Sequence, residues 1–131
     1  MFLQNLNERQ QCALLHYADA VMRADNRVEP SELVAMDMLR NQAHPGVQPE
    51  EVPIDQLGEL FKTRIGRVSL LLELVGMGYV NDDFDPRQSK LIEEVAAAFD
   101  MRGDGTLEAV ERWVVDQLDL MRKAQELMQE G

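Results

Sequence analysis

The fold of this chain is decided at two short junctions that share one pattern, DNRVEPSE at residues 25–32 and NDDFDPRQ at residues 81–88. We call them the first junction and the second junction. Each follows an apolar segment and precedes another, and the two align at a constant offset of 56 residues. Each holds polar residues, an apolar residue, an acid, a proline and a Glu or Gln, in that order. The repeat predicts a duplicated helix-turn-helix unit.

Helix capping explains most of the repeated positions. In the second junction, Asp85 is the expected N-cap, and Gln88 is spaced to close a capping box with it. Glu29 and Glu32 are spaced to do the same in the first junction, with a poorer N-cap residue. In both junctions a proline follows the N-cap, where its missing N–H costs nothing. Capping leaves unexplained the acids that come earlier in each junction.

Hydrophobic residues recur with the helical period along nearly the whole chain. We expect helices at about 6–24, 30–43, 55–61, 63–79, 86–99 and 107–128. No segment alternates in the way that a strand requires. The sequence predicts an all-α fold, a single compact bundle of about six helices. We expect one domain over 1–131, with a first unit at about 6–43, a Pro-rich linker at 44–54, a second unit at about 55–101 and a C-terminal helix at about 106–129.

The composition narrows the classes of function. The chain has 131 residues, with 13 Lys and Arg against 24 Asp and Glu, so its net charge is 13 − 24 = −11. Such a surface repels phosphate backbones and anionic lipid headgroups, so we expect neither nucleic-acid nor membrane-surface binding. A cation or a basic protein segment is a better candidate partner.

Cysteine usage and hydropathy predict a reduced, cytoplasmic setting. The single cysteine, Cys12, cannot form an intrachain disulfide. The first ten residues do not resemble a signal peptide, because no basic region precedes an apolar stretch. The most apolar stretch, residues 68–80, is too short to span a bilayer and contains Glu73. We therefore expect no direct membrane insertion.

ADNRVEPSE at residues 24–32 and VNDDFDPRQSKLIEEVAAAF at residues 80–99 resemble the junctions of TerB-like, tellurite-resistance-associated domains. That family has an ADG-x-apolar-x-x-x-E junction that recurs in a second, more degenerate half. Here Asn26 replaces the usual glycine and Gln88 replaces the second glutamate. The resemblance covers most of the chain. It implies a compact, non-enzymatic helical module that binds divalent cations at its junction acids, in a setting of chemical stress or of scaffolding near membranes.

The resemblance and the residue types together define a candidate metal site. Asp25 and Glu32 match the family's acid pair, and Asp82 is the nearest equivalent in the second half. If the two junctions lie side by side, the candidate ligands are Asp25, Glu29, Glu32, Asp82, Asp83 and Asp85. Carboxylate oxygens favour Ca²⁺ or Mg²⁺ over softer metals. The alternative is a protein–protein interaction scaffold without metal, in which these acids cap helices and face solvent.

A second candidate metal loop resembles a degenerate EF-hand at residues 100–111. Asp100, Asp104 and Glu111 stand at the first, fifth and twelfth ligand positions, and a glycine follows Asp104 at the sharp turn. Arg102 occupies the third position, where calcium requires an oxygen. The alternative is a glycine-containing turn capped by Thr106.

The rest of the sequence contains few residues in patterns that indicate catalysis or metal binding. The chain has no Gly-rich phosphate loop, nucleophile elbow or paired-cysteine motif, so we expect no enzyme. Cys12, His16 and Asp19 share one helical stripe and resemble zinc ligands, but a structural site needs a fourth. An ordinary helix face is the simpler interpretation.

The last predicted helix suggests contact with other proteins. It carries an apolar stripe past the point where a compact bundle needs one, and the stripe comprises Leu120, Ala124, Leu127 and Met128. Such a stripe completes a core, forms a dimer seam or serves as a docking surface. The expected partners are therefore other proteins or a second copy of the chain.

Overall fold

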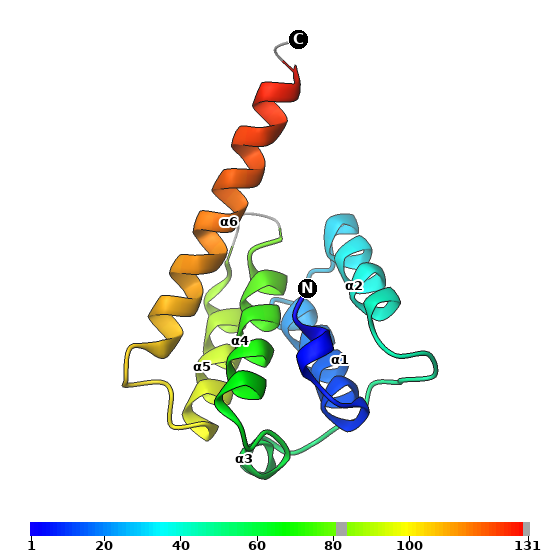
Figure 1. The fold of residues 1–131 in the computed structure, drawn as a ribbon, viewed down its shortest axis with the longest axis vertical. Coiled ribbons are helices and arrows are strands. Elements are labelled where there is room, and N and C mark those ends of the chain that lie inside the picture. Colours follow the sequence, from blue (N-terminus) through cyan, green and yellow to red (C-terminus); the bar gives the residue numbers. More distant parts are fainter. Residues whose placement is uncertain (81–83, 130–131) are drawn as a thin grey trace.

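The structure is a computed structural model that describes residues 1–80 and 84–129. Within these ranges it is all-helical, without a strand, which confirms the predicted bundle of about six helices (Figure 1). None of the helices there is long and apolar enough to cross a membrane. The α-helices are α1 (Glu8–Arg23), α2 (Pro30–Gln42), α3 (Leu57–Leu60), α4 (Arg64–Gly78), α5 (Pro86–Ala98) and α6 (Thr106–Gln129), with 3₁₀ turns at Leu3–Asn5 and Ile54–Gln56.

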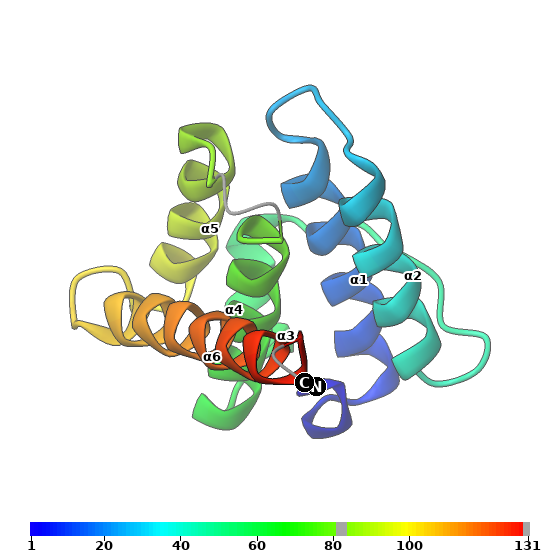
Figure 2. The same ribbon diagram turned by 90° about the horizontal axis from the view of Figure 1, so that it is seen from above.

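The helices are arranged as two related pairs. Helices α1 and α2 form one pair, α4 and α5 form the other, and the most extensive helix contact joins α1 to α4. Each outer helix also touches the inner helix of the other pair, because α5 contacts α1 and α2 contacts α4. Figure 2 shows α1 and α2 side by side, with α5 on the other side of α4. This arrangement is what a duplicated helix-turn-helix unit with approximate two-fold symmetry produces.

The core lies between the two inner helices. Leu14 and Val21 of α1 and Leu70 and Leu74 of α4 are fully buried. Helix α4 buries residues on more than one side, as its nearly continuous apolar sequence predicts. It therefore occupies the centre, and the other long helices pack around it.

The buried side-chain amide of Gln11 in α1 makes hydrogen bonds to the first 3₁₀ turn and to the linker. The Gln11 side chain is only 1% exposed. Its Nε2 donates to the carbonyl oxygens of Leu3 and Leu6, both at 3.1 Å, and its Oε1 accepts the His44 N–H at 2.9 Å. One side chain thus contacts backbone groups of two segments, and the Leu3 carbonyl accepts the Leu6 N–H at 2.9 Å as well.

Helix α6 packs on the bundle with its first half only. Leu107, Val110 and Val114 are buried against the core, and α6 makes its principal contact with α4. The second half extends beyond the other helices (Figure 1). There, Leu120 and Leu127 are 61% and 72% exposed.

Candidate functional site: the paired helix junctions

The two junctions meet at a pair of equivalent residues. Glu32 lies in the first turn of α2, and Gln88 lies in the first turn of α5. The two residues are 56 positions apart, and both are almost fully buried. The Nε2 of Gln88 donates to the Oε2 of Glu32 at 3.4 Å and to the carbonyl oxygen of Val21 at 3.0 Å. The repeat therefore brings its two copies together around one carboxylate–amide contact.

Both residues also cap their own helices. The other oxygen of Glu32, Oε1, accepts the Glu29 N–H at 3.0 Å, and the Oε1 of Gln88 accepts the Asp85 N–H at 3.3 Å. The Asp85 carboxylate accepts the Arg87 N–H at 2.8 Å. These contacts confirm the capping predicted from the spacing of both junctions. Each oxygen of the buried Glu32 carboxylate thus has a donor within the protein.

Arginine residues lie close to two partly exposed acids of the junctions, Asp85 and Asp25. The Arg87 side chain pairs with the Asp85 carboxylate at 3.1 Å, and its hydrogen bonds lower the pKa of Asp85, with a smaller contribution from the charge of Arg27. In the opposite direction, Asp85 and, more weakly, Asp25 raise the pKa of Arg87. The Arg27 N–H also donates to Asp25 at 3.0 Å. The positive charge of Arg27 therefore acts on Asp85 of the second junction, and that of Arg87 acts on Asp25 of the first.

The candidate cation ligands have the following positions. Asp82 and Asp83 lie outside the described residues. Among the others, Glu32 is buried, Asp25 and Asp85 are partly exposed, and Glu29 is exposed at the N-cap of α2. In residues 1–80 and 84–129, no three His, Cys, Asp or Glu side chains gather closely enough to hold a metal ion. The cation site at the junctions stays a prediction.

The loop before α6 is closed by an aspartate. Asp104 accepts the Thr106 N–H at 2.9 Å, and this hydrogen bond lowers the pKa of Asp104. Thr106 itself is the buried first residue of α6, so the expected cap by Thr106 is replaced by one from Asp104. Arg102 pairs with Glu93 at 3.5 Å. The carboxylate at the fifth EF-hand position thus serves the backbone of its own turn.

The other EF-hand positions are not assembled around a common point. Asp100 has a left-handed backbone, with φ of 57°. Glu111 is partly buried on α6, and its pKa is raised by burial and by the charges of Glu108 and Glu93. Asp100, Asp104 and Glu111 form no group of three in the described part of the chain.

We predict that Glu111→Gln stabilises the protein slightly at pH 7. Because its pKa is raised in the folded state, the ionised carboxylate disfavours folding, and this effect disappears as the pH falls through the raised pKa. The carboxylate is only partly buried, so we expect a gain below about 1 kcal/mol, or roughly 1–3 °C in Tm. Thermal unfolding at pH 7 and pH 4 checks this, with the difference vanishing at pH 4. A destabilised variant at pH 7 would contradict it.

Two residues of the stripe on α1 contact neighbours on their own helix. Asp19 pairs with Arg23 at 3.0 Å, one turn along the helix. His16 lies edge-on to the Tyr17 ring, with 5.0 Å between ring centroids. Cys12 is partly exposed and takes part in no disulfide. These side chains belong to no metal-binding group of the described residues.

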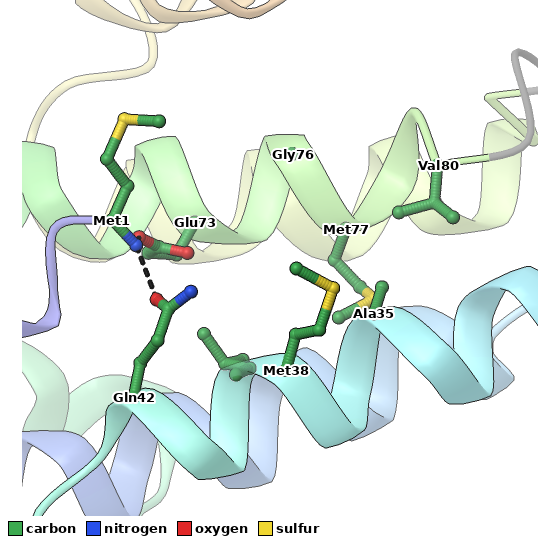
Figure 3. A pocket seen from close by; sticks show the side chains of 9 residues that line it. Met1, Ala35, Met38, Gln42, Glu73, Gly76, Met77 and Val80 are labelled. Atoms are coloured by element: carbon green, nitrogen blue, oxygen red, sulfur yellow. Dashed lines mark hydrogen bonds and ion pairs between the residues drawn. The ribbon is translucent and has the colours of Figure 1, made fainter.

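An apolar groove lies between α2 and α4, where sequence analysis placed no site. Figure 3 shows Met38 of α2 and Met77 of α4 on its two sides. The groove measures about 180 Å³, and it is lined by Met1, Ala35, Met38, Leu39, Gln42, Glu73, Gly76, Met77 and Val80. At one end the Met1 amino group donates to Gln42 at 2.6 Å and lies 3.1 Å from Glu73. The groove joins residues of both repeat units, so no single segment reveals it.

Comparison with models of protein families, with curated proteins and with solved structures finds no match for this chain. The resemblance to TerB-like domains therefore rests on the sequence of the two junctions alone.

Proposed function

We propose that this chain is a non-enzymatic, TerB-like binding module that acts by contacting another protein. The observation that supports the proposal most is the open groove between α2 and α4, where Met38 is 57% exposed. Methionine-lined grooves adapt their shape to apolar partners. Asp25, Glu32 and Asp85 have a structural role in this proposal, because each accepts hydrogen bonds from the protein. The stress-related, cytoplasmic setting belongs to the proposal through the resemblance alone.

The partner expected for the groove is an amphipathic helix with basic flanks. A helix laid in a groove buries its apolar face there and keeps its polar side in water. The chain carries a net charge of −11, so basic flanks are drawn to its surface and acidic ones are repelled.

Site-specific photocrosslinking in the host cell tests this function. A photoreactive residue at Met38 should crosslink to one protein, and the contact should map to a basic amphipathic helix. Leu33 is the control, because it is also exposed on α2 but does not line the groove. Equal crosslinking at both positions, or none at Met38, would contradict the proposal. Addition of Met38→Glu to a probe at Ala35 should abolish its crosslink.

Divalent-cation binding is the second candidate, favoured by the approach of the two acidic junctions. A cation there requires Asp25 and Asp85 to leave their present hydrogen bonds or to share them. This candidate predicts a Ca²⁺- or Mg²⁺-dependent rise in Tm that Asp25→Asn removes. The protein-binding function predicts the same Tm with and without the ions.

A further inference from the structure

The exposed side of α6 carries a regular apolar seam. Trp113, Leu120 and Leu127 follow each other at intervals of seven residues and are 41%, 61% and 72% exposed. Gln117 and Ala124 lie between them, so the spacing alternates between four and three. This is the spacing by which two helices pack side by side in a coiled coil. Within residues 1–80 and 84–129, no other helix covers the second half of the seam (Figure 1).

An apolar hollow lies beside the first half of the same seam. It measures about 320 Å³ and lies between α6 and α4, lined chiefly by Phe2, Val68, Leu72, Ala109, Val110 and Trp113. Phe2 meets Trp113 edge-on, with 5.5 Å between ring centroids. Leu127 is 14 residues beyond Trp113, or about 21 Å along the helix. Leu127 therefore cannot fill the hollow of its own chain.

The α6 helix of a second copy of the chain, packed in the antiparallel direction, fits both the exposed seam and the apolar hollow. Opposing Gln117 to Leu120 of the second copy also opposes Ala124 to Trp113 and Leu127 to Val110. Leu127 of each copy then reaches the apolar hollow of the other. Such a contact is isologous, since two-fold symmetry makes both halves the same.

Two charged residues beside the seam are also placed to form ion pairs in this antiparallel register. Asp116 and Lys123 lie on one edge of the seam, seven residues apart, and both are exposed. In the antiparallel register, Asp116 of each copy lies beside Lys123 of the other. Among the described residues, Lys123 makes one exposed contact, of 3.6 Å with Asp119. Two intermolecular ion pairs are therefore formed without breaking a strong internal one.

We propose that two copies of this chain associate through antiparallel α6 helices, with Leu120 near the centre and Leu127 in the hollow of the partner. The charge distribution favours this contact over others between two acidic chains. Residues 116–129 carry three acids and two bases, a net charge of −1, against −11 for the whole chain. The antiparallel direction also keeps the two acidic bundles at opposite ends. The hollow beside α6 and the groove between α2 and α4 share none of their described lining residues.

Complementary charge variants test the proposal by sedimentation equilibrium of the full chain. We expect the wild type to dimerise, and Asp116→Lys and Lys123→Asp each to weaken self-association about tenfold or more, because each sets like charges against each other twice. An equimolar mixture of the two variants should regain the dimer, since opposite charges then face each other in both pairs. Glu126→Lys, the same change on the outer side of α6, is the control and should dimerise like the wild type.

Circular dichroism shows whether each variant keeps the helical content of the wild type. A wild type that is monomeric at several hundred micromolar would overturn the proposal. A dimer that both variants leave unchanged, or a mixture that associates no better than its components, would overturn the α6 register. None of these results bears on the crosslink at Met38, so failure of the dimer and failure of the proposed function are distinguishable.

Discussion

Gln88→Glu should be among the most destabilising single substitutions in this protein at pH 7. The introduced carboxylate would face Glu32 across 3.4 Å in a buried site, where the amide now donates a hydrogen bond. The Val21 carbonyl would also lose one of its two donors and keep the Ala24 N–H. An uncompensated buried charge costs about 3–5 kcal/mol, a large share of the stability of a small domain.

The pH dependence of this variant identifies the cause. Two carboxyl groups this close share a proton, which raises one pKa of the pair. The variant should therefore recover stability as the pH falls from 7 towards 5, measured by urea unfolding relative to the wild type. Gln48→Glu, the same change at an exposed linker position, is the control and should alter stability by less than about 0.5 kcal/mol. Recovery with calcium at pH 7, without recovery on acidification, would contradict the capping role of this pair.

Gln11→Leu should destabilise the protein by about 2–4 kcal/mol, although it exchanges a polar core residue for an apolar one of similar size. The substitution removes the donor for the Leu6 carbonyl, one of two donors for the Leu3 carbonyl, and the acceptor for the His44 N–H. Backbone groups that remain buried without partners cost more than the added leucine gains. Chemical denaturation measures the change.

Gln4→Leu provides the matched control for this prediction. Gln4 lies in the same 3₁₀ turn that Gln11 holds, but it is exposed. We expect its substitution to leave stability within about 0.5 kcal/mol of the wild type. Faster amide hydrogen exchange at His44 in Gln11→Leu alone would locate the damage. Equal stability of both variants would show that water replaces the lost contacts.

Local patterns predicted the helices well because local interactions determine where helices start. Pro86 follows a good N-cap residue, and the sequence predicted a helix from residue 86 to about residue 99, where α5 ends at Ala98. The spacing of Glu29 and Glu32 likewise predicted the capping seen at the start of α2. These features depend on side chains and backbone groups within four residues of each other.

Contacts between the two units could not be predicted from local sequence patterns. The offset of 56 residues aligned Glu32 with Gln88, but their direct contact depends on how α1 packs against α4. The groove depends on the same packing, because Met38 and Met77 come from different units. At residues 100–106 the sequence showed the spacing of calcium ligands. It did not reveal that Asp104 would accept a hydrogen bond from the backbone of its own turn. A carboxylate suited to a cation is equally suited to a backbone N–H.

We infer that Asp25, Glu32 and Asp85 stabilise the fold through hydrogen bonds, and that the apolar surfaces bind other proteins. Amide-shift titration of chelator-treated protein with Ca²⁺, Mg²⁺ and Zn²⁺ tests it most directly. We expect no saturable shift at millimolar Ca²⁺ or Mg²⁺ in residues 25–32, 84–88 or 100–111, and none with Zn²⁺ around Cys12 and His16. Saturable shifts at both junctions, abolished by Asp25→Asn, would contradict it and establish a cation-binding module.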